Sequence, residues 1–82
     1  MDNAFELPIE YNGKEYLFLA SLITYGYTYK IAVTVFDTII NFEPDEEGHY
    51  RALVNPEDIK HNTTITKDLL QTIAEKLHEL LR

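Results

Sequence analysis

Apolar and polar residues alternate over residues 5–11, which is the pattern of a half-buried β-strand. The residues expected on its apolar face are Phe5, Leu7, Ile9 and Tyr11. Asn12-Gly13 follows and predicts a tight hairpin, because a type I′ turn needs positive φ at both central residues. Pro8 cannot donate a hydrogen bond to a neighbouring strand, so this strand is predicted at an edge of its sheet.

Further turn signals predict an antiparallel meander. Tyr25-Gly26 and Asp37-Thr38 are the next two-residue turns, and residues 45–48 predict a three-residue hairpin loop closed by a glycine. The strands of the meander are predicted at about residues 5–11, 15–24, 27–36, 39–43 and 49–54. Asn55-Pro56 is expected to end the sheet and can start a single helical turn, and residues 61–64 are expected to be a connector.

These turn positions also predict which residues pair. The predicted pairs include Leu7 with Phe18, Ala20 with Ile31, Val33 with Phe42, and Glu43 with Arg51. One apolar face continues across the first four strands, whereas a slip of one residue would move every side chain to the other face. The opposite charges of Glu43 and Arg51 favour a cross-strand ion pair.

The period of the apolar positions changes near the C-terminus and predicts a helix over about residues 67–81. The apolar residues at helical spacing are Ile65, Leu69, Leu70, Ile73, Ala74, Leu77 and Leu81. Thr66 is a favourable N-cap, and Ile65 and Leu70 then occupy the two positions of a hydrophobic staple.

The predicted fold class is α+β: an antiparallel β-meander of four to five strands packed against one C-terminal α-helix, as a single domain over residues 1–82. Five strands spaced ~4.8 Å apart form a sheet roughly 20–24 Å wide, but a helix is only ~10–12 Å across. One helix cannot cover such a sheet unless the sheet curls around it. We therefore expect either a strongly curled half-barrel or pairing with another chain.

The opposite face of the predicted sheet is not uniformly polar. Its apolar residues form a candidate interaction surface: Leu17, Leu19, Ile23, Ala32, Phe36 and Ile39. Three interpretations fit this pattern, namely an ordinary sheet surface with exposed aliphatic residues, self-association as a homodimer, and binding of another protein. For the homodimer, Leu17, Leu19 and Ala32 are expected at the contact.

Composition narrows the classes of function. The chain has 82 residues, no cysteine and a net charge of −7, which excludes disulfides and thiolate zinc sites and disfavours binding to nucleic acid phosphates. No apolar run approaches the ~20 residues that cross a bilayer, so no membrane association is expected. The first residues lack a secretory signal pattern, and a cytoplasmic protein is expected.

The sequence nominates no catalytic residue, metal ligand or cofactor site. His49, His61 and His78 lie in three separate segments, so neither metal binding nor catalysis is expected of them. The acidic residues 45–47 are expected to form a solvated turn, and the aromatic segment 25–29 to pack structurally. We therefore expect a protein that is not an enzyme, since no acid, base and nucleophile are brought together.

Three segments carry a resemblance to a known family: Leu7-Pro8-Ile9-Glu10-Tyr11-Asn12-Gly13, residues 25–30 (YGYTYK) and residues 42–51 (FEPDEEGHYR). On these segments the chain resembles a family of short uncharacterised bacterial proteins. The resemblance implies a bacterial, cytoplasmic setting and assigns no activity and no functional residues.

The leading functional hypothesis is a non-enzymatic protein-interaction module, either a homodimer or bound to an unknown protein partner. A second hypothesis is a small-ligand-binding domain, with a pocket between sheet and helix lined by Tyr11, Tyr16 and Tyr29. A third is an acidic mimic of nucleic acid, which requires carboxylates aligned on one face at the spacing of phosphates.

Overall fold

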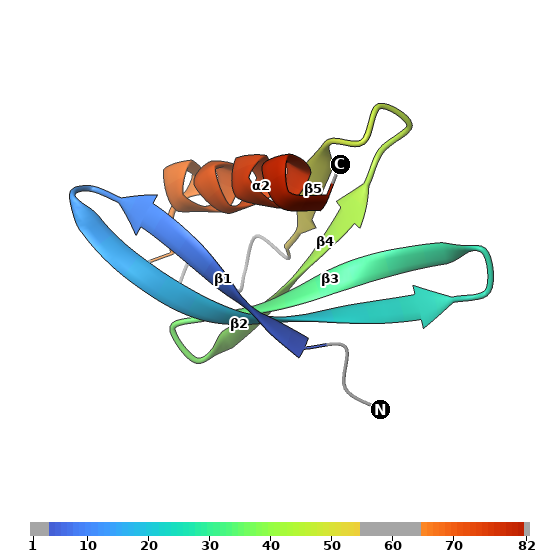
Figure 1. The fold of residues 1–82 in the computed structure, drawn as a ribbon, viewed down its shortest axis with the longest axis horizontal. Coiled ribbons are helices and arrows are strands. Elements are labelled where there is room, and N and C mark those ends of the chain that lie inside the picture. The colour runs from blue at the N-terminus through green and yellow to red at the C-terminus, as the bar shows by residue number, and fades with distance from the viewer. Residues whose placement is uncertain (1–3, 55–64, 82) are drawn as a thin grey trace.

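The computed structural model describes residues 4–54 and 65–81. Five antiparallel strands form one sheet in chain order, and the helix α2 (Lys67–Leu81) packs against it (Figure 1). The strands are β1 (Ala4–Tyr11), β2 (Lys14–Tyr25), β3 (Thr28–Val35), β4 (Thr38–Pro44) and β5 (Tyr50–Leu53). The predicted α+β meander is confirmed, and α2 has the predicted bounds. The helical turn and connector predicted over residues 55–64 lie outside the described residues.

The first and last hairpins have the predicted registers. Tyr11 pairs with Lys14 across Asn12 and Gly13, whose φ values of 53° and 77° are those of a type I′ turn. Strand β1 lies at the sheet edge, where the missing N–H of Pro8 is tolerated. At the other end of the meander, Glu43 pairs with Arg51.

The two middle hairpins differ from prediction by one residue in the position of the turn. Their central residues are Gly26-Tyr27 and Phe36-Asp37, so Ala20 pairs with Val33 and not with Ile31, and Val33 pairs with Ile40 and not with Phe42. Moving a two-residue turn by one position shifts each partner by two residues. Because side chains alternate with a period of two, every residue paired in these two ladders keeps its predicted face.

The sheet curls into a half-barrel, which solves the coverage problem posed by a single helix. The first part of β2 pairs with β1 and its last part pairs with β3, with only Leu19, Ala20 and Ser21 paired on both sides. This stagger lets the sheet coil, and α2 packs mainly against the two edge strands, β1 and β5. The helix therefore lies across the opening between the edges (Figure 1).

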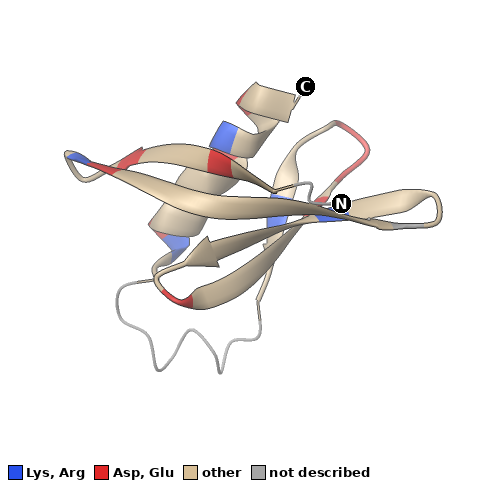
Figure 2. Ribbon diagram, turned by 60° about the horizontal axis from the view of Figure 1, so that its bottom comes forward, with Lys and Arg blue, Asp and Glu red and all other residues tan. Residues whose placement is uncertain are grey.

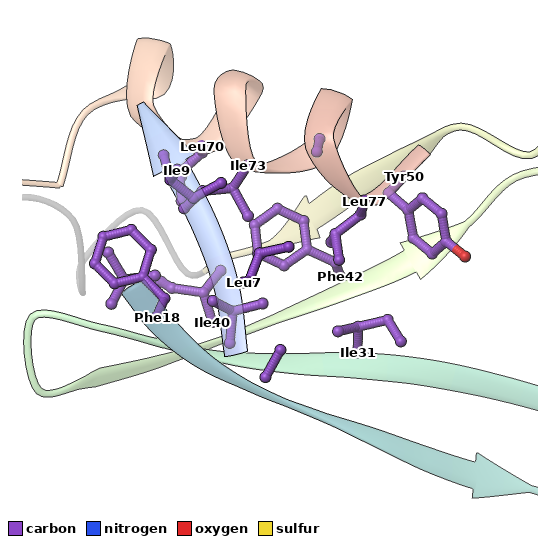
Figure 3. Packing of buried hydrophobic residues seen from close by; sticks show 14 of the residues in the cluster. Leu7, Ile9, Phe18, Ile31, Ile40, Phe42, Tyr50, Leu70, Ile73 and Leu77 are labelled. Atoms are coloured by element: carbon purple, nitrogen blue, oxygen red, sulfur yellow. The ribbon is translucent and has the colours of Figure 1, made fainter. Parts of the chain in front are cut away.

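The core lies between α2 and the concave face of the sheet (Figure 3). Leu7, Phe42, Leu69, Ile73 and Leu77 have no exposed surface. Complete burial of such a side chain contributes roughly 1.5–3 kcal/mol relative to leaving it in water. No polar or charged residue is buried among the described residues, so hydrophobic burial holds the helix in place.

The start of α2 confirms the predicted N-cap and staple. The backbone N–H of Leu69 donates to Thr66 Oγ1 at 3.1 Å, which satisfies one of the free N–H groups of the first turn. Ile65 and Leu70, the predicted staple residues, are 3% and 6% exposed. The structure thus shows why the helix begins at Lys67.

Candidate functional site

The outer face of the sheet, away from α2, carries most of the predicted interaction surface. Leu17, Leu19 and Ile39 are 67%, 54% and 67% exposed. They alternate along β2 and β4 with Phe18 and Ile40, whose side chains point into the core. The exposed positions are therefore a consequence of strand alternation and not of a local distortion.

Cross-strand pairing brings these side chains into one surface. Leu19 pairs with Thr34, and Thr34 pairs with Ile39, so the three form one row across β2, β3 and β4. The neighbouring row consists of Ser21, Ala32, Asn41 and Leu53. We call these two rows together with Leu17 the outer patch. It contains no charged residue.

Charged residues surround the outer patch. Glu6 pairs with Leu19 from the edge strand β1, and Lys30 lies on β3 beyond Ala32. On the β5 side, Arg51 Nε donates to Glu43 Oε1 at 2.9 Å. In Figure 2 the middle of the sheet is free of charged positions, which lie toward its edges and turns and on the helix. The result is an uncharged centre within a charged rim.

Two residues of the predicted surface lie away from its centre. Ile23, 36% exposed, lies near the end of β2 and pairs with Lys30. Phe36 lies in the β3–β4 turn with φ of 47°, and its ring centroid is 5.4 Å from those of Tyr16 and Phe18, edge-on to both. Phe18 is a core residue, so Phe36 packs on the core side and its predicted place on the outer face is wrong.

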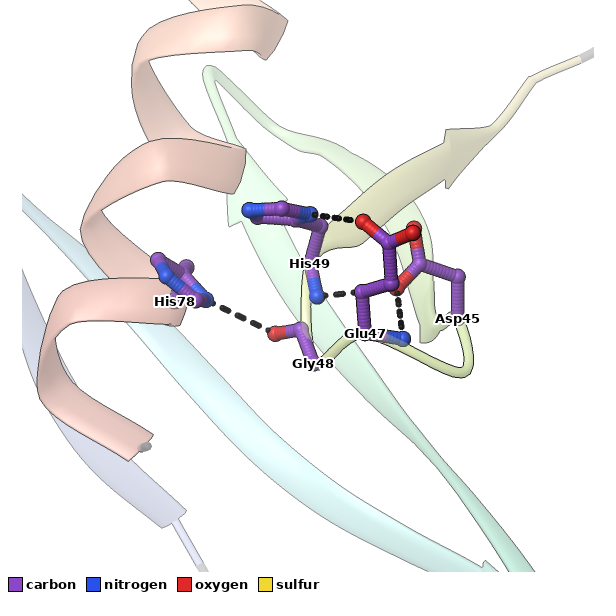
Figure 4. Close-up of polar contacts among 5 residues, drawn as sticks. All are labelled: Asp45, Glu47, Gly48, His49 and His78. Carbon is purple, nitrogen blue, oxygen red and sulfur yellow. Dashed lines mark hydrogen bonds and ion pairs between the residues drawn. The ribbon is translucent and has the colours of Figure 1, made fainter.

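The acidic turn between β4 and β5 is organised by Asp45. Its Oδ1 accepts hydrogen bonds from the backbone N–H groups of Glu47, at 2.8 Å, and His49, at 3.0 Å (Figure 4). Gly48 has φ of 86° and closes the predicted loop. The carboxylate of Asp45 therefore serves the turn itself, and residues 45–49 are all exposed.

The turn meets the helix through two histidines that the sequence places far apart. The ring centroids of His49 and His78 are 4.4 Å apart, and His78 Nδ1 lies 2.9 Å from the carbonyl oxygen of Gly48. Sequence reasoning missed this contact, since strand pattern and helix period do not predict which helical turn packs beside which hairpin. Within residues 4–54 and 65–81, no three His, Cys, Asp or Glu residues are grouped to hold a metal ion.

The three tyrosines proposed to line a ligand pocket are engaged in different contacts. Tyr11 Oη lies 3.0 Å from Thr66 Oγ1, Tyr29 Oη lies 2.6 Å from Tyr50 Oη, and Tyr16 stacks on Phe18 with centroids 5.5 Å apart. Burial of the Tyr50 hydroxyl raises its pKa well above the ordinary value. The hydrogen bond to Tyr29 and the electrostatic interaction with Tyr29 raise this pKa further. Tyr16 and Tyr29 line two different hollows on the surface.

Acidic side chains are distributed over several elements. The acidic residues of the described strands, turns and helix are Glu6, Glu10, Glu15, Asp37, Glu43, Asp45, Glu46, Glu47, Asp68, Glu75 and Glu79. Lys14, Lys30 and Arg51 lie among those of the sheet, and Lys67 and Lys76 among those of the helix (Figure 2). This scattered arrangement does not favour a mimic of nucleic acid.

In the part of the chain that the structure describes, no helix is both long and apolar enough to cross a membrane. No family model, no curated protein and no solved structure matches this chain, so its function is argued from its own surfaces.

Proposed function

We propose that this protein is a non-enzymatic interaction module that forms a homodimer through the outer patch. The observation that carries the proposal is the exposure of Leu17, Leu19 and Ile39 on a sheet whose other face is already covered by α2. A large apolar group left in water costs roughly what its burial would contribute, about 1.5–3 kcal/mol. Three such groups around an uncharged centre are typical of a protein-binding surface.

The distribution of charge supports a second copy as the partner. Each chain has a net charge of −7, which opposes association of two copies. The outer patch, however, has no charge at its centre, and α2 carries its charged residues on the opposite side of the sheet. That layer lies ~10 Å away, beyond the ~8 Å over which charges interact strongly at physiological salt. Repulsion between the helices is therefore weak, and the charges close to the interface are those of the rim, such as Glu6 beside Leu19.

The order of the strands makes the outer patch suitable for pairing with itself. β3 is the central strand, with β2 on one side and β4 on the other. A two-fold axis along β3 places Leu19 of each chain opposite Ile39 of the other, so one contact is made twice. Thr34 then lies close to the axis. Two twisted sheets packed in this way form a β-sandwich about 10 Å thick.

The size of the sheet is sufficient for such an interface. The molecule measures 34 × 28 × 27 Å along its principal axes. A face of that size is comparable with the ~800 Å² that each partner contributes to a standard protein–protein interface. Because the outer face is the convex side of the curled sheet, two copies meet at its centre, over β2, β3 and β4, where the two rows of the outer patch lie.

The proposal is tested by two double variants of opposite charge. Leu19→Lys with Ile39→Lys gives a double-lysine variant, and Leu19→Glu with Ile39→Glu gives a double-glutamate variant. Each alone is expected to be monomeric in multi-angle light scattering, since like charges then face each other across the axis. An equimolar mixture is expected to regain the dimer mass, because Lys and Glu become opposed.

The matched control is Leu80→Lys, which changes a leucine that is 48% exposed on α2. It adds the same charge outside the outer patch and is expected to leave the dimer intact. Dimers that persist in both double variants, or a mixture that stays monomeric while both variants are folded, would contradict the proposed interface.

A further inference from the structure

A pair of histidines joins the β4–β5 turn to the last turns of α2. The rings of His49 and His78 are in contact, with centroids 4.4 Å apart and planes inclined by 43°. The side chain of His49 is 56% exposed, so the pair is open to solvent. Gln71, Ala74 and Glu75 on α2 line the same shallow hollow.

In both rings the Nδ1 atom faces an oxygen atom, and in His78 it is hydrogen-bonded. His78 Nδ1 lies 2.9 Å from the carbonyl oxygen of Gly48, and because a carbonyl only accepts, Nδ1 carries the proton. His49 Nδ1 lies 3.7 Å from Glu47 Oε2. Figure 4 shows the second nitrogen of each ring on the side away from these partners. His78, held through Nδ1–H by a carbonyl with Nε2 facing away from it, has the arrangement of a metal ligand, and the ring of His49 is in contact with it.

We propose that the Nε2 atoms of His49 and His78 bind one divalent transition-metal ion, with water completing its coordination. Two nitrogens at ~2.1 Å from a tetrahedral Zn²⁺ ion lie about 3.4 Å apart. The ring centroids are 4.4 Å apart, and rotation of the exposed His49 side chain that opens the angle of 43° between the ring planes would let both nitrogens face one ion. Glu75, which precedes His78 by one helical turn, lines the same hollow and could follow as an oxygen ligand.

The chemistry of the donors defines the class of ion. Imidazole nitrogen suits Zn²⁺, Ni²⁺ and Cu²⁺, whereas Ca²⁺ and Mg²⁺ require several oxygen ligands. The Oδ1 atom of Asp45, which would be one such oxygen, is held by two backbone N–H groups. Binding needs neutral imidazole, so protons compete with the ion for the two nitrogens.

The experiment is a Zn²⁺ titration of the full chain without a histidine tag. Binding is measured by calorimetry and by the NMR signals of the histidine ring protons. The expected result is saturable binding of one ion per chain, with the signals of His49 and His78 shifted together. His49→Ala and His78→Ala are each expected to weaken binding at least ~10-fold, because each leaves a single nitrogen ligand. The control is His61→Ala, outside the described residues, which is expected to bind as the parent chain does.

Thermal unfolding gives a second readout, since an ion that binds only the folded chain raises the midpoint by an amount that grows with the ratio of its concentration to Kd. Zn²⁺ is expected to raise the unfolding midpoint of the parent chain and of His61→Ala, but not that of His49→Ala or His78→Ala. Ca²⁺ is expected to raise none of these midpoints. Absence of saturable binding would overturn the proposal. So would equal loss in His61→Ala, full binding in either His49→Ala or His78→Ala, or displacement of Zn²⁺ by Ca²⁺.

Discussion

The hydroxyl oxygen of Tyr11 lies 3.0 Å from Oγ1 of Thr66, which connects the end of β1 to the N-cap of α2. Thr66 Oγ1 also accepts the backbone N–H of Leu69 at 3.1 Å. A single hydroxyl therefore caps the helix and holds its first turn against an edge strand. In a half-barrel whose two edges are bridged by one helix, this contact fixes where the bridge begins.

Thr66→Ala removes both interactions and is expected to lower the free energy of unfolding by about 1–2 kcal/mol. Thr66→Ser keeps the hydroxyl and is expected to lose much less. Tyr11→Phe removes only the contact between the side chains and is expected to fall between the two. Urea denaturation of the three variants measures these differences, and an equal loss for alanine and serine would show that the hydroxyl is not the cause.

Leu77→Ala tests the core at the centre of the helix-to-sheet contact. Leu77 has no exposed surface, so its truncation removes buried methyl groups and leaves a cavity, with an expected cost of about 2–5 kcal/mol. Leu80→Ala, one helical turn further on, truncates a leucine that is 48% exposed and is expected to cost less than about 0.5 kcal/mol. Similar losses for the two variants in urea denaturation would contradict the packing of α2.

The Tyr29–Tyr50 pair predicts how stability depends on alkaline pH. Burial raises the pKa of Tyr50 in the folded chain, and the hydrogen bond to Tyr29 raises it further. The unfolded chain therefore releases this proton first as the pH rises through about 10. Because the unfolded state then binds fewer protons, the free energy of unfolding falls above that pH, by up to ~1.4 kcal/mol per pH unit.

Tyr50→Phe removes the titrating group and is expected to flatten this decline, although it starts from a lower stability because the contact with Tyr29 is lost. Urea midpoints of the parent chain and the variant at about pH 9 and about pH 11, on either side of the ordinary tyrosine pKa, measure the two slopes. A variant whose midpoint declines as steeply as that of the parent chain would assign the effect to other groups.

Added salt is expected to strengthen the dimer, whereas it would weaken a complex held together by ion pairs. Two chains of −7 each repel one another, whereas the outer patch is uncharged. Raising the salt concentration from about 0.01 M to 0.15 M shortens the screening length from ~30 to ~8 Å, so the dimer is expected to become tighter. Sedimentation velocity at the two salt concentrations measures the change, and dissociation by added salt would indicate an interface built on ion pairs.

The faces of the strands and the position of the helix were predictable from periodicity, because both follow from burial of apolar side chains. Turn positions were less well determined where the turn residues were ambiguous. Asn12-Gly13 allowed one position, and its register is correct. Gly26 tolerates positive φ at either central position of a turn, and the structure has it first, with φ of 56°, where type II′ turns place a glycine.

Phe36 shows what local sequence rules do not capture. Bulky residues seldom adopt positive φ, so Phe36-Asp37 carries no turn signal, although both have positive φ in the structure. The contacts of the Phe36 ring with Tyr16 and Phe18 offset this strain, and they depend on the completed fold. The contact between His49 and His78 was unpredictable for a related reason, since it depends on how α2 lies across the two edges of the sheet.

The exposed outer patch makes self-association the central claim, and sedimentation equilibrium of the unmodified chain over a range of concentrations tests it most directly. The mass is expected to rise with concentration from one chain of 9.6 kDa toward two and not beyond two, because a two-fold contact closes on itself. A chain that remains a monomer at high micromolar concentration would contradict it.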